Sequence, residues 1–348
     1  MRGYPVIPSD TLAALGWNTD FLRQIDPTET GTVDPARVTG VHRNRLDVLT
    51  ANGPTDLIPA SDMNTGNVAV GDWVLSRAHV ALRVLDRNSL LQRRAAGTTV
   101  ARQLIAANVD TALITSSCNA DFNVSRLERY LVLCASAGIE PVLVLTKADT
   151  CPDPETFIAA GRAMLRGLAV VALDAHAGTV RTELADWCRT GRTVVLLGSS
   201  GVGKTTLSNA LTGGDAAVQS VREDDAKGRH TTTSRSLVAM IDGGWLIDTP
   251  GVRELQLTDV ADGIDLLFDD LTALALTCRF TNCKHQVEPG CAVLAAISEG
   301  TLDPARVTRW EKLVHEDRHN SVSIQQAHQR ARTFGKAGRH AAAKRKGR

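Results

Sequence analysis

The chain has 348 residues, of which 43% are hydrophobic and 22% are charged, and its formal net charge is +1. One hydrophobic core rarely serves so long a chain, so two or three domains are expected. The sequence contains no apolar run near the ~20 residues that cross a bilayer. The first ten residues also lack the uninterrupted apolar stretch of a secretory signal. These features argue against a membrane protein, and we expect a cytoplasmic protein with no membrane partner.

Short segments of alternating hydrophobicity fill residues 30 to 95. Asn52-Gly53 lies between two of them and is typical of a hairpin turn, because both residues tolerate the positive φ that tight turns need. We predict a small β-barrel within residues 1–98, similar to the oligonucleotide-binding (OB) fold. Trp73 is the only aromatic residue of residues 30 to 95, so these residues by themselves give little indication of base stacking. The candidate strands are Arg37–Val41, Leu46–Thr50, Asp72–Ser76 and Leu82–Leu85.

Buried apolar runs alternate with helical patterns in residues 99–265, which predicts an α/β domain with a mainly parallel, doubly wound sheet. Residues 266–325 are expected to be helical and to include a cysteine cluster, and residues 326–348 to be a disordered basic tail. The candidate strands of the α/β domain are Thr111–Thr115, Pro141–Leu145, Ala169–Leu173, Thr193–Leu197 and Trp245–Ile247, and its candidate helices include Ser125–Ala137 and Thr205–Leu211.

A phosphate-binding loop follows the apolar strand Thr193–Leu197 and opens a helix. Its sequence fits the pattern G-x-x-x-x-G-K-[ST] in the strand–loop–helix context that gives this pattern its meaning. Glycines let backbone N–H groups turn toward the phosphates, and the helix N-terminus adds partial positive charge. The lysine binds the β- and γ-phosphates, and the threonine hydroxyl after it is a ligand for Mg²⁺. The residues are Gly198, Ser199, Ser200, Gly201, Val202, Gly203, Lys204 and Thr205.

Two further motifs bear on which nucleotide is bound. Asp248-Thr-Pro-Gly251 follows a strand, where the acid can hold Mg²⁺ through water and the glycine can reach the γ-phosphate. The second motif is Thr146, Lys147, Ala148 and Asp149, which resembles the N/T-K-x-D guanine reader of G proteins. Its aspartate would accept hydrogen bonds from the ring N–H and exocyclic amine of guanine, and Lys147 would pack over the base. A surface turn is the alternative interpretation of these four residues.

The order of the motifs is unusual, because the base reader precedes the phosphate loop by 49 residues instead of following it. Joining the chain at a different point leaves the ends of parallel strands where they were, so the site survives. In this respect the sequence resembles the circularly permuted GTPases that depend on the small ribosomal subunit. The resemblance covers nearly the whole chain: the β domain, Thr146–Asp149, Gly198–Thr206, Asp248–Gly251 and the cysteine/histidine segment, together with a first switch, Gly228-Arg-His-Thr-Thr-Thr233.

The resemblance implies a GTPase that binds GTP and GDP with Mg²⁺ and assists late maturation of the small ribosomal subunit. Thr206, and Thr231 or Thr232 of the switch, would contact the nucleotide or its Mg²⁺. The residue after the switch glycine is Val252, where many GTPases have a water-orienting Gln, so His230 is the candidate to orient the attacking water. A solvent-exposed loop histidine is its alternative. For the whole chain, the alternatives are a phosphate-loop kinase and a nucleotide-gated RNA-binding module.

Three cysteines and a histidine lie within fourteen residues: Cys278, Cys283, His285 and Cys291. Three thiolates and one imidazole form a complete tetrahedral set for structural zinc, with no open position for catalysis. The alternative is reduced cysteines packed in a helical hairpin, because the spacing is not the common C-x-x-C. The family resemblance places zinc ligands at these four positions.

The C-terminal tail is strongly basic, since no acidic residue follows Asp317. Such a tail suits a phosphate backbone such as rRNA, and it is equally compatible with a solvated segment that has no partner. We expect a monomer. The basic residues are Arg330, Arg332, Lys336, Arg339, Lys344, Arg345, Lys346 and Arg348.

Overall fold

A computed structural model describes residues 12–94, 102–214, 235–248, 257 and 259–321 of the chain. Contacts divide the chain into two compact units, one made of Met1–Gln92 with Leu104–Glu254 and the other of Arg93–Gln103 with Leu255–Arg348. Among the described residues, no helix is both long and apolar enough to cross a membrane. Each unit is described below by itself.

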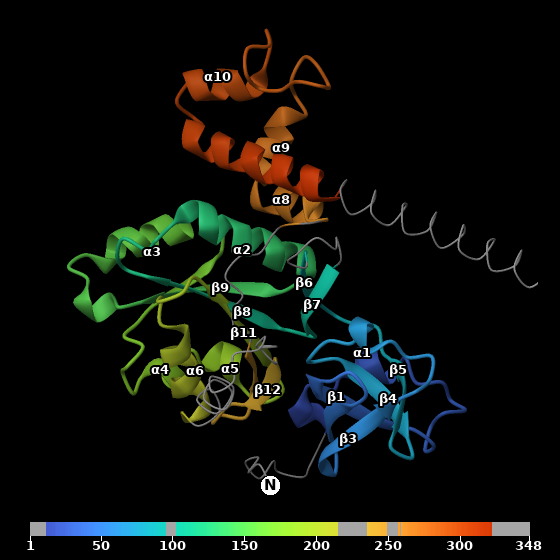
Figure 1. Ribbon diagram of the computed structural model, residues 1–348. Helices are drawn as coiled ribbons and strands as arrows, with labels where there is room; N and C mark the ends of the chain where they lie inside the picture. The colour runs from blue at the N-terminus through green and yellow to red at the C-terminus, as the bar shows by residue number, and fades with distance from the viewer. Residues whose placement is uncertain (1–11, 95–101, 215–234, 249–256, 258, 322–348) are drawn as a thin grey trace, which may run out of the picture. The chain divides into compact units, whose positions relative to one another are not determined.

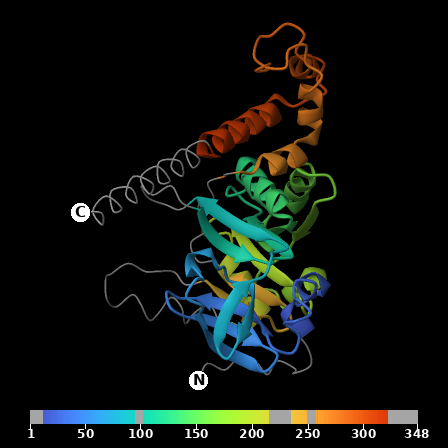
Figure 2. The same cartoon turned by 90° about the vertical axis from the view of Figure 1, so that its right-hand side faces the viewer.

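Five strands in the first unit close into a barrel with the order β1-β2-β3-β5-β4. They are the blue strands in the lower part of Figure 2. All pairs are antiparallel except β3 with β5. Small and branched side chains fill the interior, among them Ala36, Val48 and Val74. The predicted OB-like barrel is confirmed. Its strands are β1 (Asp34–Val41), β2 (Leu46–Thr50), β3 (Gly53–Pro59), β4 (Trp73–Arg77) and β5 (Val80–Val84).

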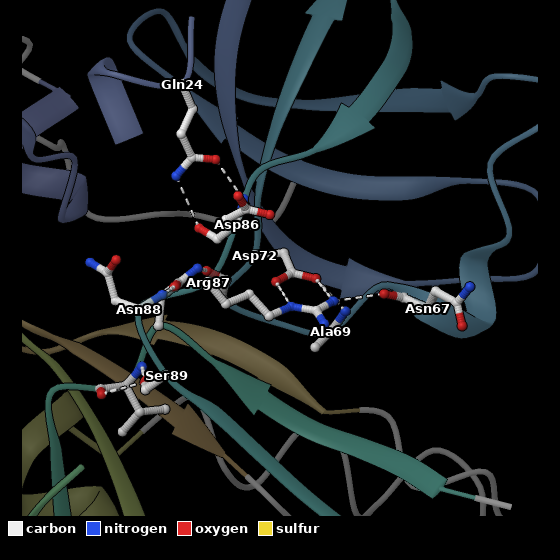
Figure 3. Close-up of polar contacts among 11 residues, drawn as sticks. Gln24, Asn67, Ala69, Asp72, Asp86, Arg87, Asn88 and Ser89 are labelled. Carbon is white, nitrogen blue, oxygen red and sulfur yellow. Dashed lines mark hydrogen bonds and ion pairs between the residues drawn. The ribbon is translucent and has the colours of Figure 1, made fainter. Parts of the chain in front are cut away.

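A buried ion pair ties the barrel to the segment that leaves it after β5. The carboxylate of Asp72 is fully buried and receives two hydrogen bonds from Arg87, of 2.6 and 2.7 Å, and one from the backbone N–H of Ala69 (Figure 3). Burial raises the pKa of Asp72, while the bonds from Arg87 act in the opposite direction. Arg87 also donates to the carbonyl of Asn67. This exit segment is therefore fixed to the barrel by a bidentate contact.

The α/β part of the first unit has a six-stranded sheet with the order β10-β9-β8-β11-β13-β12. Every pair is parallel except β12 with β13. The central strands β8 and β11 are buried along their whole length, as expected of a sheet covered on both faces. The predicted mainly parallel sheet is confirmed. Its strands are β8 (Thr111–Ser117), β9 (Glu140–Thr146), β10 (Ala169–Ala172), β11 (Thr193–Gly198), β12 (Ser236–Ala239) and β13 (Trp245–Asp248).

Helices lie on both faces of this sheet (Figure 1): α2 and α3 on one, and α4, α5 and α6 on the other. On the second face, Leu184, Leu207 and Leu211 pack against strand residues such as Val142 and Val194. The side chain of Asn123 caps the longest of these helices by accepting from the N–H of Arg126. The bounds are α2 (Val124–Ala137), α3 (Pro154–Arg162), α4 (Val180–Glu183), α5 (Ala185–Cys188) and α6 (Lys204–Thr212).

A buried arginine joins the barrel to the strand that carries the phosphate loop. Arg37 of β1 is 1% exposed, and its guanidinium donates to the carbonyl of Leu15 and, at 2.5 Å, to the hydroxyl of Thr193 at the start of β11. Burial lowers the pKa of Arg37 to about 10, so the side chain remains charged at neutral pH. The remaining short elements of the first unit are η1 (Leu12–Leu15), α1 (Thr19–Leu22), η2 (Thr65–Asn67) and η3 (Ala148–Thr150).

The regular structure of the second unit after residue 257 is helical, with α8 (Ala261–Leu267), α9 (Asp269–Ala275), α10 (Ala292–Ser298) and a helix over residues 304–321. The cysteine cluster was expected inside helical structure, but residues 276–291 form turns and bends between α9 and α10. Strands β6 (Leu90–Arg94) and β7 (Arg102–Ala107) pair as a separate two-stranded sheet. The segment limits at residues 98, 265 and 325 stay predictions, and the basic tail lies outside the described residues.

Candidate functional site

The phosphate loop leaves the sheet at Gly198, the last residue of β11, and ends at Lys204, the first residue of α6. Gly198 has φ +144°, and a Cβ atom there would lie 2.2 Å from the carbonyl oxygen of Thr115 on the neighbouring strand β8. Gly201 and Gly203 have φ +82° and +93°, in the left-handed region that favours glycine. The loop conformation therefore requires glycine at the positions where the motif has it.

Two cationic side chains converge on Ser199, the second residue of the loop. The ammonium group of Lys204 donates to the carbonyl oxygen of Ser199. Nη1 of Arg126, from the first turn of α2, donates to the hydroxyl of the same residue at 2.6 Å. The phosphate end of the loop thus has two positive charges, one from each of the helices α2 and α6.

Thr146 is the last residue of β9 and is fully buried beside the phosphate loop. Its hydroxyl oxygen lies 2.7 Å from the carbonyl oxygen of Val202 and 3.1 Å from that of Ser116. One hydroxyl proton can be donated to only one acceptor at a time, and the shorter contact is to the loop. In this geometry Thr146 joins the predicted base reader to the phosphate loop.

The rest of the predicted base reader forms a tight turn at the end of β9. Lys147 has φ +59°, a conformation uncommon for a residue with a side chain, and Ala148 to Thr150 form the short helix η3. The N–H of Ala148 donates to the carbonyl of Leu173, just after β10. Asp174 follows, and its side chain accepts from the N–H of His176. The loop after β10 thus lies against the predicted base reader.

Strand order explains how motifs separated in the sequence come together. β9, which ends in Thr146, is parallel to β8, and β8 is parallel to β11, which ends in Gly198. Parallel neighbours have their carboxyl ends at the same edge of the sheet, which is where ligands bind in such folds. Asp248 ends β13 on the other side of β11. The motifs are therefore permuted along the sequence, but in space they lie at one edge of the sheet, as in a chain with the usual motif order.

The second unit contains the one group of potential metal ligands found among the described residues. The ligand atoms of Cys278, Cys283, His285 and Cys291 all lie within 4.8 Å of one another. Nδ1 of His285 lies 3.6 and 3.4 Å from Sγ of Cys278 and Cys291, and these two sulfurs are 3.9 Å apart. A tetrahedral zinc site has ligand–ligand spacings of about 3.6 Å for N to S and about 3.8 Å for S to S. The donor set and these spacings fit zinc.

The backbone around the cluster helps to hold the thiolates and the imidazole. Burial raises the pKa of Cys278, but hydrogen bonds from the N–H groups of Ala292 and Val293, together with those from the neighbouring cysteines of the cluster, lower it overall. Burial raises the pKa of Cys283 to about 11. The His285 ring lies 5.5 Å from that of Trp310, which places the helix of residues 304–321 beside the cluster.

Glu288 organises the loop between Cys283 and Cys291, and sequence reasoning did not identify it. Its carboxylate accepts hydrogen bonds from the N–H groups of Lys284, Gln286 and Val287, at 2.9 to 3.0 Å. These bonds lower the pKa of Glu288 to about 2. The loop backbone on both sides of His285 is thus wrapped around one carboxylate. The only indication of this role in the sequence was the position of the glutamate between His285 and Cys291.

Several predicted site residues cannot be placed. His230, Thr231, Thr232 and Gly251 lie outside the described residues, as does Val252. For Asp248 the backbone is described and the side chain is not. Their assigned roles stay predictions.

Together, the fold and the loops define the class of the protein: a phosphate-loop nucleotide-binding protein whose predicted base reader precedes the phosphate loop in the chain. The RsgA GTPase family matches residues 84–258. A protein of Mesorhizobium japonicum named small ribosomal subunit biogenesis GTPase RsgA is 51% identical, over 90% of this chain and 92% of its own. A Vibrio parahaemolyticus protein named small ribosomal subunit biogenesis GTPase RsgA 2 is 44% identical, over 95% and 93%.

Solved structures agree on the fold. YjeQ from Thermotoga maritima superposes with a TM-score of 0.60 at 23% identity, covering 82% of this chain and 98% of its own. YloQ, described as a circularly permuted GTPase, superposes with a TM-score of 0.58 at 21% identity, covering 85% and 99%. The chain belongs to the RsgA GTPase family.

Proposed function

We propose that this chain binds GTP with Mg²⁺ and hydrolyses it to GDP and phosphate. The observation that carries the proposal is the hydrogen bond of 2.7 Å from Thr146 to the carbonyl of Val202. It joins a loop suited to guanine with a loop suited to phosphates at one edge of the sheet. A nucleotide bound across both loops contacts the base reader with its base and the phosphate loop with its phosphates.

In this proposal the phosphate loop supplies charge and the turn after β9 supplies base selectivity. Lys204 binds the β- and γ-phosphates, and Thr205 and Asp248 hold Mg²⁺, directly or through water. The other loop residues, from Gly198 to Thr206, offer N–H groups to the phosphates. Asp149 accepts from the ring N–H and exocyclic amine of guanine, and Lys147 lies over the base. Thr146 acts on the loop rather than on the base.

A hydrogen-bonding group must orient the attacking water. Val252, the residue after the switch glycine, cannot do so, because a valine side chain neither donates nor accepts hydrogen bonds. We assign this role to His230, with Thr231 or Thr232 at the Mg²⁺ and Gly251 at the γ-phosphate. Hydrolysis by the free protein is then slow, and a partner that orders the switch accelerates it.

The partner we propose is the small ribosomal subunit, in its late maturation. The support is that two relatives, which are 44 and 51% identical over at least 90% of this chain, are named small ribosomal subunit biogenesis GTPases. The barrel and the basic tail are candidate contacts with rRNA, and so is the segment with the zinc ligands, whose Cys₃His set would hold one structural zinc ion. We propose a cytoplasmic monomer. A phosphate-loop kinase is not favoured.

Turnover of GTP and of ATP, each with and without purified small ribosomal subunits, tests this function. We expect a preference for GTP and strong stimulation by small subunits, with purified large subunits as the control. Equal turnover of GTP and ATP without any response to small subunits contradicts the proposal. Transfer of phosphate to a small molecule instead of water would support the kinase alternative.

The base reader has a chemical test of its own in Asp149→Asn. A carboxylate only accepts hydrogen bonds, whereas an amide also donates. The variant is therefore expected to lose affinity for GTP and gain affinity for xanthosine triphosphate, whose carbonyl replaces the exocyclic amine of guanine. Asp153→Asn, at the exposed N-cap of α3, is the matched control and should leave both affinities unchanged. If Asp149→Asn binds GTP as well as the parent does, Asp149 does not read the base.

A further inference from the structure

An arginine on α2 reaches the phosphate loop from a part of the chain that belongs to none of the nucleotide-binding motifs. Arg126 lies in the first turn of α2, where its N–H is held at 3.0 Å by the side chain of Asn123. Its Nη1 donates to the hydroxyl of Ser199, 73 positions further along the chain, at 2.6 Å. The backbone of Arg126 is therefore positioned by the helix cap and its guanidinium by the phosphate loop.

The guanidinium lies at the phosphate end of the site rather than at the base end. The turn that begins at Thr146 marks the base end, because it is the predicted guanine reader. Lys204 marks the phosphate end, since the lysine of this motif binds the β- and γ-phosphates. The carbonyl of Ser199 accepts a hydrogen bond from Lys204, and the hydroxyl of Ser199 accepts one from Arg126. The arginine and the lysine thus meet at the same residue of the loop.

Hydrolysis of a phosphoanhydride places growing negative charge on the γ-phosphate oxygens and on the bridging oxygen that leaves. Positive charge aimed at these atoms accelerates the reaction, and an arginine is especially effective because its planar fork can bind two oxygens. A guanidinium has five N–H donors, and the bond to Ser199 uses one of them. The Arg126 side chain is exposed, so its outer atoms can turn toward a bound nucleotide at little cost in packing.

We propose that Arg126 is a catalytic arginine that the chain supplies to its own γ-phosphate. Water attacks the γ-phosphorus, and the bond from that phosphorus to the bridging oxygen breaks, with its electron pair leaving on GDP. One proton of the water stays on the inorganic phosphate and the other passes to solvent. Arg126 keeps its proton throughout and donates hydrogen bonds to the γ-phosphate oxygens. The proposal rests on GTP hydrolysis as the reaction of this protein.

Single-turnover hydrolysis by the full-length protein tests this role in Arg126→Ala, Arg126→Lys and the control Arg162→Ala, which removes an exposed arginine from the end of α3. Arg126→Ala is expected to hydrolyse GTP about 10³-fold more slowly, at the lower end of what such an arginine contributes. Its affinity for GDP and for a non-hydrolysable GTP analogue should stay unchanged. It should also fail to bind GDP with aluminium fluoride, which imitates the transferring phosphoryl group. Arg126→Lys should recover only part of the rate.

A bracing role for Arg126 gives different results, so the two can be told apart. If the arginine only holds the loop, Arg126→Ala loses nucleotide affinity together with rate, and Ser199→Ala, which removes the same hydrogen bond, causes an equal loss. Either result overturns the proposal, as does a rate for Arg126→Ala equal to that of the parent. Addition of guanidinium ions at millimolar concentration should partly restore hydrolysis by Arg126→Ala. A parent protein that does not hydrolyse GTP at all would instead refute the proposed function.

Discussion

The phosphate loop and the cysteine cluster are both short segments rich in functional residues, but their structures have different origins. The phosphate loop lies between a fully buried strand and a helix, and its backbone is fixed by the sheet behind it. The cluster lies in sixteen residues of turns and bends, from 276 to 291, between two helices of seven residues each. The phosphate loop thus takes its conformation from the surrounding fold and does not need a bound nucleotide for it. The cluster is expected to depend on a bound zinc ion for its own structure.

The largest expected effect is the loss of zinc from the cluster. Structural zinc contributes about 10–16 kcal/mol in small zinc domains, which is folding energy for a segment with so little regular structure. Cys283→Ser or a strong chelator should therefore unfold the second unit and abolish zinc binding by metal analysis. The affinity for GDP should stay unchanged, because the nucleotide site has its own core. A second unit that keeps its thermal transition without zinc would remove the proposed difference between the sites.

Lys204→Ala is the corresponding change at the phosphate loop. Loss of charge-assisted hydrogen bonds to phosphate costs about 3 kcal/mol, or roughly 100-fold in Kd for GTP. The temperature of unfolding should fall little, because the strand and helix on either side hold the loop and Lys204 adds only its bond to the carbonyl of Ser199. Calorimetric titration and thermal unfolding of the same samples check both parts. A marked fall in the unfolding temperature would mean that this loop, too, depends on its functional side chain.

Thr146→Val tests how firmly the two nucleotide loops are joined. Valine has nearly the same shape but leaves the carbonyl of Val202 without its partner, which costs about 1–3 kcal/mol in free energy of unfolding. Weaker nucleotide binding should accompany that loss. Thr146→Ser keeps the hydroxyl and should lose less. Thr150→Val, which removes an exposed hydroxyl bonded to the carbonyl of Lys147, is the matched control and should change stability little.

The smallest effect is expected from Glu288→Gln and appears as a dependence on pH. The folded protein lowers the pKa of this carboxyl from 4.5 to about 2. A carboxyl with a lowered pKa in the folded state adds stability that is fully present above its unfolded pKa and is lost as the pH falls toward the folded value. The parent should therefore lose stability in the second unit between about pH 4.5 and pH 2, and the variant should lose less over that range. Thermal unfolding of the second unit at a series of pH values measures it, with Glu299→Gln as the control.

Much of the fold was predictable because each element depends on residues close to it in the sequence. The parallel strands are apolar runs, and the hairpin between β2 and β3 was indicated by Asn52-Gly53. Strand β3 was not predicted, since Pro54 and Pro59 lower the strand tendency of a segment in which only Leu57 is buried. Strand β12 was not predicted either. It has only four residues and lies at the edge of the sheet beside β13, and so short a segment is too small to show the hydrophobic pattern that identifies a strand.

The sequence by itself determined the chemistry of both sites: glycines and a lysine at phosphate-loop spacing, a base-reader motif, and three thiols with one imidazole. These are local patterns, in which a few adjacent residues decide what the backbone and side chains can do. Only the tertiary structure decided what meets across long separations, namely Thr146 with Val202, Arg126 with Ser199, and Arg37 with Thr193. Such contacts depend on the order of strands in the sheet and the direction of each side chain. No pattern of neighbouring residues contains that information.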